Sequence, residues 1–310
     1  MADQKENSEL FFEKELLSPY NYFLQIKGKQ LRIKIVFAFN HWLQLPTEKL
    51  RELLDILNMI YVSYFLCDDI QDGSNIRGVS PAAHCIYGVP LTINASIQAL
   101  LLGLERASNL SSEACKVIIE EYLEVIRGQG IEIYWRDNFI CPTEEQFRKM
   151  LERKSCRFVM LIIRFIQLFS KNKTDYTKLV VILGTYLQIH DDYCNLNHQK
   201  GLELWPESED EKACTETRFC EDITEGKFTL PIIHAMKTPY GEQILNILRQ
   251  RTRDVDLKRH CVSLLEKAGS LQYTRDAMNE LDREARAEIT RLGGNSMLEA
   301  ILDQFLEWQT

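Results

Sequence analysis

The chain has 310 residues, of which 45% are hydrophobic and 26% are charged, the balance of a soluble globular protein and not of a disordered tail. Its 37 Lys and Arg residues are outnumbered by 45 Asp and Glu residues, so the net charge is −8 and nucleic acid is not an expected partner. A local phosphate site built from a few cations or metal ions remains compatible with this charge.

The chain ends and the cysteines predict a cytoplasmic protein with no stable membrane anchor. Residues 1–6 have no apolar core, and the C-terminus carries no prenylation box. No apolar run reaches the roughly 20 residues that cross a bilayer. The nine cysteines form no C-x-x-C pair, which is typical of reduced thiols.

Helical spacing of apolar residues dominates the chain from end to end. Thr47 before Glu48 is an expected N-cap, and Thr143 after Pro142 marks another helix start. No stretch alternates like a strand, and residues 198–217 are expected to form a polar surface loop. We therefore expect one all-α domain over residues 1–310, a bundle of about ten helices. The spacing predicts helices over residues 30–42, 50–70, 111–137, 143–170, 174–196, 256–267, 273–292 and 296–308.

Two acidic clusters each close one of the apolar helices. Asp68 and Asp72 are four residues apart in the sequence DDIQD, so on a helix they share a face and can hold one cation. Asp191 and Asn195 repeat that spacing. Hard oxygen ligands suit Mg²⁺, which is normally held by a few carboxylates together with substrate phosphates. Either cluster alone would fit a solvated helix end, but the occurrence of two favours a metal site.

Several cations accompany the acidic clusters. Lys29 and Arg32 lie near the start of the helix expected at 30–42, where free backbone N–H groups and the helix dipole favour anions. Arg77 follows the first acidic cluster, Lys154 lies within the helix expected at 143–170, and Lys227 lies in the sequence EGKF. Each of them alone would equally fit a solvated surface charge, so their weight as phosphate ligands comes from the acidic clusters.

These motifs resemble the trans-isoprenyl diphosphate synthases, and the animal geranylgeranyl diphosphate synthases in particular. The resemblance implies an all-α isoprenoid synthase helical bundle with two facing aspartate-rich helices, assembled as a homodimer or higher homo-oligomer. It implies an allylic prenyl diphosphate as substrate and Mg²⁺ as cofactor, with three ions in the family pattern and Mn²⁺ as an alternative. The matching segments are GKQLR (28–32), FNHWL (39–43), DDIQD (68–72), HCIYG (84–88), IYWRDN (133–138), FCEDITEGKF (219–228) and NILRQRT (246–252).

The resemblance also assigns roles to residues at the matching positions. Tyr64 lies one helical turn before Asp68, where an aromatic floor favours a C10 or C15 substrate over C20, and ordinary core packing is the alternative reading. The expected metal ligands are Asp68, Asp69, Asp72, Asp191 and Asp192. The expected catalytic residues are Asp68, Asp72, Asp191, Arg77, Lys154 and Lys227. The expected diphosphate ligands are Arg77, Lys154, Lys227, Gln188, Lys29 and Arg32, and the expected chain-cavity residues are Tyr61, Tyr64, Phe65 and Arg157.

The chain departs from the family pattern in the pocket for isopentenyl diphosphate. The family has a His where this chain has Tyr61, and a second Arg where this chain has Gly78. Each charge-assisted contact is worth about 1.5–3 kcal/mol, so losing both predicts binding weaker by orders of magnitude. Departures near the allylic diphosphate are Thr217 with Arg218 in place of a Lys, and Ser155, Cys156 and Arg157 in place of Thr-Gly-Gly.

Two enzymatic functions and one non-enzymatic function follow from these observations. The two donors missing from the isopentenyl diphosphate pocket favour a terpene synthase, which ionises an allylic diphosphate and lets the cation lose a proton or cyclise. The alternative is a condensing geranylgeranyl or farnesyl diphosphate synthase, with Lys29, Arg32 and His84 compensating for the missing pair. A non-catalytic subunit that tunes an active partner is disfavoured because the aspartates are intact.

Overall fold

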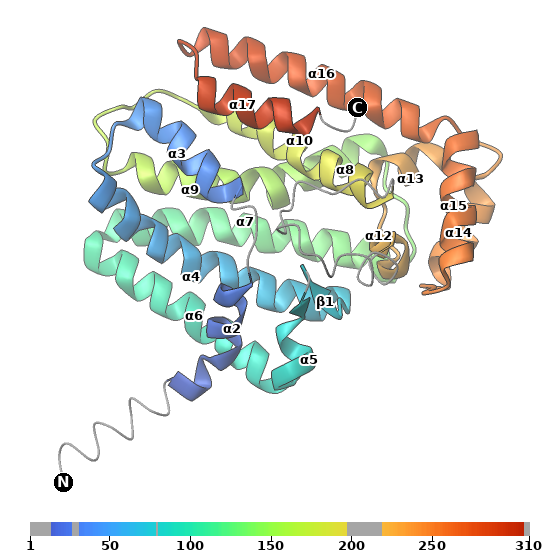
Figure 1. Ribbon diagram of the computed structural model, residues 1–310, viewed down its shortest axis with the longest axis horizontal. Helices are drawn as coiled ribbons and strands as arrows, with labels where there is room; N and C mark the ends of the chain where they lie inside the picture. Colours follow the sequence, from blue (N-terminus) through green and yellow to red (C-terminus); the bar gives the residue numbers. More distant parts are fainter. Residues whose placement is uncertain (1–13, 27–30, 79, 197–218, 307–310) are drawn as a thin grey trace. The chain divides into compact units, whose positions relative to one another are not determined.

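The computed structural model describes residues 14–26, 31–78, 80–196 and 219–306 (Figure 1). The described structure is helical almost throughout, which confirms the predicted all-α class. Its one sheet is a short antiparallel hairpin of β1 (Ile76–Arg77) and β2 (Ser80–Pro81). None of the described helices combines the length and the apolar character needed to span a membrane.

Internal contacts group the chain into two compact units, which are described separately below. Unit 1 comprises Met1–Gly28 and Pro46–Lys116, and unit 2 comprises Lys29–Leu45 and Val117–Thr310. The boundary falls inside α7 (Ser112–Asp137), a single uninterrupted helix. The assignment of residues 1–310 to one domain remains a prediction.

Unit 1 is built on α4 (Thr47–Asp72), which confirms the helix predicted at 50–70 and extends it at both ends. Thr47 is the first helical residue, and Pro46 is the N-cap, without a side-chain capping bond. The prediction of Thr47 as N-cap was therefore wrong by one residue, because the extended backbone of Pro46 already occupies the cap. The other helices of unit 1 are α2 (Ser18–Gln25), α5 (Ala83–Tyr87) and α6 (Val89–Leu110).

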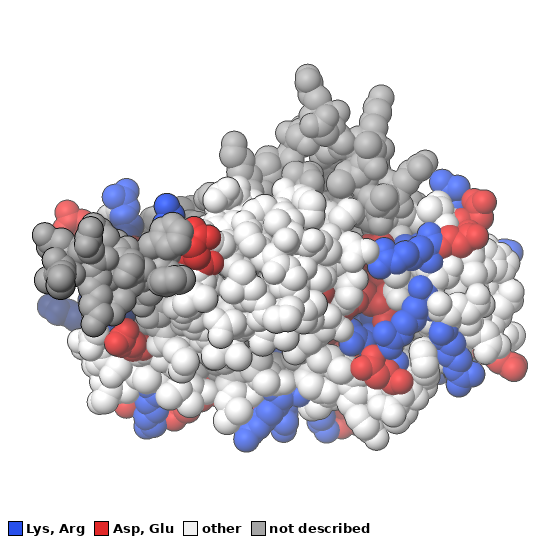
Figure 2. Space-filling model, turned by 90° about the horizontal axis from the view of Figure 1, so that it is seen from below, with Lys and Arg blue, Asp and Glu red and all other residues white. Residues whose placement is uncertain are grey.

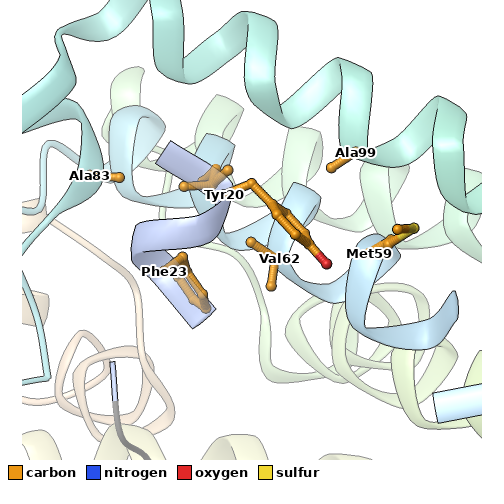
Figure 3. Close-up of a cluster of buried hydrophobic side chains, with 7 residues drawn as sticks. Tyr20, Phe23, Met59, Val62, Ala83 and Ala99 are labelled. Atoms are coloured by element: carbon orange, nitrogen blue, oxygen red, sulfur yellow. The ribbon is translucent and has the colours of Figure 1, made fainter. Parts of the chain in front are cut away.

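Large apolar residues of α6, such as Ile97 and Leu101, are exposed, and the face that packs on α4 carries small residues. The small residues Ala95, Ala99, Gly103 and Ala107 are buried and recur every four residues, so the two helices approach closely. A Cβ atom at Gly103 would lie 2.7 Å from the Ile60 side chain. The core of unit 1 is completed by Tyr20 and Phe23 from α2, which pack with Met59, Val62, Leu66, Ala83 and Ala99 (Figure 3).

Unit 2 contains the remaining helices, and α16 lies along α10 within it (Figure 1). The helix start predicted at Thr143 is confirmed, and the structure adds a capping box there: the Thr143 hydroxyl accepts from the Gln146 N–H, and the Gln146 side chain accepts from the Thr143 N–H. The loop expected at 198–217 lies outside the described residues. The helices are α3 (Leu31–Leu43), α8 (Glu144–Leu151), α9 (Arg157–Gln167), α10 (Thr177–Leu196), α12 (Glu221–Glu225), α13 (Leu230–Ala235), α14 (Gly241–Arg249), α15 (Val255–Lys267), α16 (Ser270–Arg291) and α17 (Ser296–Phe305).

The single helix predicted at 143–170 is interrupted by a π-helical turn, η1 (Glu152–Cys156), between α8 and α9. Two glycines on neighbouring helices make room for the widened turn. A Cβ atom at Gly128 of α7 would lie 2.6 Å from the Lys154 backbone nitrogen, and one at Gly184 of α10 would lie 2.6 Å from the Cys156 Cα. Single π turns inside α-helices frequently mark functional sites, and this one carries Lys154.

Candidate functional site

The first predicted acidic cluster forms the last turn of α4 in unit 1. Asp68 and Asp69 are buried and Asp72 is half-buried, and Gly73 ends the helix with a left-handed backbone (φ +67°). Asp68 and Asp72 occupy positions i and i+4 of one helix, as the spacing predicts.

Arg77 on β1 is held against this turn by two carboxylates and one aromatic ring. Its Nε donates to Asp69 Oδ1 at 2.8 Å, and its Nη2 contacts Asp69 and lies 3.4 Å from Asp68 Oδ2. Its guanidinium carbon lies 4.9 Å from the centroid of the Phe65 ring, within the range of a cation–π interaction. The predicted diphosphate ligand is thus already oriented by the chain.

Aromatic rings cluster one turn earlier on α4, at the positions predicted to line the chain cavity. The Tyr61 and Phe65 ring centroids are 4.5 Å apart, those of Tyr64 and Phe65 are 5.1 Å apart, and Phe23 of α2 lies 6.5 Å from Tyr61. Tyr64 is buried, whereas Tyr61 and Phe65 are partly exposed. The three predicted cavity residues on α4 are therefore neighbours, and Phe65 additionally supports Arg77.

The second predicted acidic cluster lies near the end of α10 in unit 2. Asp191 is half-buried, and Asp192 is 1% exposed. Asp192 Oδ1 accepts hydrogen bonds from Gln188 Nε2 and Lys227 Nζ, each at 2.9 Å. The Asn195 amide oxygen accepts from the Asp222 backbone N–H at 3.2 Å, so this side chain holds α12 in place.

Lys227 lies among several carboxylates of unit 2. Its Nζ is 2.9 Å from Asp192 Oδ1 and 3.8 Å from Asp222 Oδ1. Burial alone would lower the pKa of Lys227, but Asp192, Asp222 and Glu132 outweigh burial and raise that pKa well above its ordinary value. Lys227 is therefore a permanent cation at physiological pH.

Lys154 on η1 pairs with the buried carboxylate of Glu132 on α7. Burial would raise the pKa of Glu132, but Lys154 and Lys227 lower it below its ordinary value, so this carboxylate is ionised. The neighbouring Ser155 hydroxyl donates to Gln188 Oε1 at 2.8 Å. Ser155, Gln188, Asp192 and Lys227 thus form a continuous chain of hydrogen bonds.

The other predicted site residues have varied placements. Lys29, Thr217 and Arg218 lie outside the described residues, and Arg32 is half-buried in the first turn of α3. Arg157 is exposed, and its guanidinium lies 3.3 Å from the buried Glu121 carboxylate. Its role in the chain cavity remains a prediction, and the contact shown is an ion pair with α7.

Glu132 and Asp222 lie beside the cations of this group but were absent from the predicted site residues, whereas Asn195 was predicted as part of the second acidic cluster. Asp222 stands inside the matching segment at 219–228, so its position was readable from that motif. Glu132 could have been found because buried polar residues recur at helical spacing on α7, at Gln129, Glu132 and Arg136.

The residues of both groups fit a hard divalent cation. Asp192 Oδ2 is buried and, among the described residues, accepts no hydrogen bond, so one carboxylate oxygen remains to be satisfied. No group of three or more His, Cys, Asp or Glu side chains in the described ranges is placed to hold a metal ion by itself. Mg²⁺ commonly completes its shell with waters and substrate phosphates, so two or three carboxylates suffice.

Comparisons with known proteins identify the family of this chain. The polyprenyl synthetase family model matches residues 13–265, and the chain belongs to that family. It is 51% identical over 298 residues to a terpene synthase from Matsumurasca onukii, covering 96% of this chain and 94% of the relative. It is 38% identical over 295 residues to a geranylgeranyl pyrophosphate synthase from Mucor circinelloides f. lusitanicus, covering 93% and 92% of the two chains. A geranylgeranyl pyrophosphate synthase from Penicillium paxilli is also 38% identical, over 98% of this chain and 80% of the relative.

Proposed function

We propose that this chain is a terpene synthase derived from a prenyl diphosphate synthase. It would ionise an allylic prenyl diphosphate, of C10 or C15 length, with Mg²⁺ and release a terpene hydrocarbon and diphosphate. The family membership supplies the substrate class, and the terpene synthase relative at 51% identity supports the lyase over the transferase.

The proposal rests on a contrast between the groups that would ionise the allylic diphosphate and the groups that would bind isopentenyl diphosphate. The acidic clusters and their cations are retained, and Lys154, Lys227 and Arg77 are each held by a carboxylate. At the two positions where the family donates to isopentenyl diphosphate, Tyr61 packs among aromatic rings and Gly78 has a left-handed backbone with φ +64°. Ionisation therefore keeps its acidic clusters and the cations Arg77, Lys154 and Lys227, whereas condensation loses two of its donors.

The proposed reaction breaks the allylic C–O bond heterolytically, so diphosphate leaves with the electron pair. Mg²⁺, when bound, would neutralise the charge that develops on the departing diphosphate. Lys154 and Lys227 are positioned by Glu132 and Asp192, so they need little reorganisation during bond cleavage. The Tyr61 and Phe65 ring faces favour a carbocation, which then gives up a proton to the departing diphosphate.

The condensing synthase is the second candidate, and the relatives at 38% identity support it. It requires isopentenyl diphosphate to bind through Arg32, Lys29 and His84 without the missing pair. The two candidates differ in one observable: only the lyase forms a volatile product from the allylic substrate alone.

The test uses purified chain with Mg²⁺ and either geranyl or farnesyl diphosphate, with and without isopentenyl diphosphate. Products are identified by gas chromatography before and after phosphatase treatment. We expect a hydrocarbon without isopentenyl diphosphate. A longer prenyl diphosphate, formed only when isopentenyl diphosphate is added, would overturn the proposal in favour of the transferase.

A matched pair of variants on α4 ties the product to the site. Asp68→Asn removes a buried carboxylate of the acidic cluster and is expected to lower product formation by about a hundredfold. Asp55→Asn makes the same change at an exposed position of the same helix and should leave product formation unchanged. Equal activities of the two variants would remove the acidic cluster from the mechanism.

A further inference from the structure

Lys258 on α15 is a buried cation outside the groups described above. Its side chain is 2% exposed, and its Nζ donates to the Phe219 carbonyl oxygen at 2.7 Å and lies 3.3 Å from Glu221 Oε1. A buried ammonium is costly unless it is paired and hydrogen-bonded, so these two contacts account for its tolerance in the core. The contacts lie on one short segment of chain.

That segment contains an unfavourable backbone conformation, which Lys258 spans. Cys220 lies between the two residues that Lys258 contacts, and it has φ +49° and ψ +54°, the left-handed region that a residue with a Cβ seldom adopts. Cys220 is fully buried, and the Arg259 guanidinium lies 5.9 Å from the centroid of the Phe219 ring. The Lys258 ammonium therefore binds Phe219 and Glu221, the residues on either side of Cys220, where the chain turns into α12.

The reversal leads directly to Lys227. The Asp222 N–H donates to Asn195 Oδ1, and the Lys227 N–H donates to the Asp222 carbonyl oxygen at 2.9 Å. The Thr224 hydroxyl donates to the Thr252 carbonyl oxygen at 3.0 Å. The segment at 219–227 is thus fixed at its start by Lys258, and its last residue presents the ammonium that pairs with Asp192.

We propose that Lys258 is a positioning residue, which fixes the chain reversal at Cys220 and so sets the place of Lys227 in the diphosphate site. The part of this inference that concerns diphosphate rests on the proposed function. The part that concerns the segment at 219–227 stands on the contacts alone. The two parts are tested by separate measurements.

The first measurement is amide hydrogen exchange by mass spectrometry on the full chain. Lys258→Met keeps the length of the side chain and removes the ammonium, and exchange at 219–227 is expected to rise about tenfold while the helices of unit 1 stay protected. Lys267→Met makes the same change at an exposed position of the same helix and should leave exchange unchanged. If Lys258→Met does not fold, Glu221→Gln replaces it, with an expected rise of about threefold at the same residues.

The second measurement is calorimetric titration with inorganic diphosphate and Mg²⁺. Lys258→Met is expected to weaken binding about tenfold, and to add little in a Lys227→Met background, because Lys258 acts on diphosphate only by positioning Lys227. Lys267→Met should bind like the unsubstituted chain.

Unchanged exchange at 219–227 in the folded variant would overturn the inference. The inference would also be overturned if the losses of diphosphate affinity caused by Lys258→Met and Lys227→Met multiply in the double variant. Lys258 would then act independently of Lys227. Failure of the unsubstituted chain to bind diphosphate would count against the proposed function instead, and the exchange measurement would still decide the role of Lys258.

Discussion

At the scale of single residues, Lys227 shows how much the surroundings of a side chain determine its role. The sequence EGKF is compatible with an ordinary exposed lysine. In the structure, Asp192, Asp222 and Glu132 surround its ammonium, and its side chain is only 12% exposed. Two of these carboxylates, Asp192 and Glu132, are far from Lys227 in sequence, so the sequence around EGKF does not reveal them.

Lys227→Met is expected to destabilise the fold as well as the site. Removing the cation leaves buried carboxylates unpaired, which costs about 3 kcal/mol or more in the free energy of unfolding. Diphosphate release should fall with it. The measurements are urea unfolding and a diphosphate-release assay, with the exposed Lys237→Met as control. A variant as stable as Lys237→Met would contradict the buried-pair interpretation.

The contribution of Lys227 to the free energy of unfolding should also depend on pH. Because its pKa is raised in the folded chain, its contribution is complete below the ordinary value of 10.5 and is lost as the pH rises through the folded value. The unsubstituted chain should therefore lose stability in the alkaline range more steeply than Lys227→Met does.

The site residues could be predicted by type and spacing, but not by partner. Asp68 with Asp72 is a relation within one helix, so the sequence spacing sufficed to find it. Lys154 with Glu132 and Arg77 with Phe65 are contacts between different elements, and no local pattern records them. Tertiary packing decides which carboxylate or ring each cation meets.

At the scale of elements, the π turn η1 depends on the two glycines that face it. The widened turn brings the Lys154 backbone so close to α7 that only a residue without a Cβ fits at position 128. Gly128 and Gly184 therefore have a steric role, whereas the exposed Gly130 meets nothing within 4 Å.

Two glycine substitutions on α7 should have effects of opposite sign. Gly128→Ala forces the η1 backbone to move and is expected to cost about 1–3 kcal/mol and to lower diphosphate release. Gly130→Ala, two residues later, should raise the free energy of unfolding by about 0.5–1 kcal/mol through helix propensity and leave activity unchanged. Thermal unfolding and a diphosphate-release assay measure both. Equal effects of the two would exclude the steric role.

A hydrogen bond between α8 and α16 makes another element-scale prediction. The Tyr273 hydroxyl donates to Glu144 Oε2 at 2.5 Å. Burial would raise the pKa of Glu144, but this bond and Arg148 lower it below its ordinary value of 4.5. Its contribution is therefore present above about pH 4.5 and is lost as the pH falls through the folded value.

Tyr273→Phe is accordingly expected to lower the free energy of unfolding by about 1 kcal/mol at pH 7, since the pair is partly exposed. The difference from the unsubstituted chain should shrink at pH 3. Urea unfolding at both pH values measures it, with the exposed Tyr134→Phe as control. A difference that stays the same at both pH values would show that the carboxylate is not involved.

The apolar pattern predicted α4 but did not predict α6. The pattern at 50–70 led directly to α4. The buried residues of α6 are small (Ala, Gly, Ser and Thr), while Ile97 and Leu101 are exposed, so the helix shows a weak apolar periodicity. The interruption at 152–156 was also missed, because the need for a wide turn arises from the neighbouring helices.

At the scale of the whole molecule, the relation between the two units can be tested by calorimetry. We expect one cooperative thermal transition for residues 1–310. The helix α7 has its first turn in unit 1 and the rest in unit 2, so unfolding of either unit would disrupt a helix that the other unit shares. Two separated transitions in a differential scanning experiment would contradict the single-domain prediction.

One face of the molecule carries charged side chains of both signs. On the face drawn in Figure 2, basic side chains adjoin acidic ones. Opposite charges also pair four residues apart on one helix, as Arg148 does with Glu144. The net charge of −8 is therefore compatible with the buried cations that we assign to diphosphate.

The left-handed turn at Gly78 has a consequence for the history of the chain. A residue with a Cβ at φ +64° costs about 1–2 kcal/mol, so restoring an arginine there would strain the β1–β2 hairpin before its charge could be useful. For a descendant of a chain with arginine at this position, the reverse substitution would carry this strain. On the proposed function, descendants of this chain would therefore change their hydrocarbon products more easily than they would regain condensation with isopentenyl diphosphate.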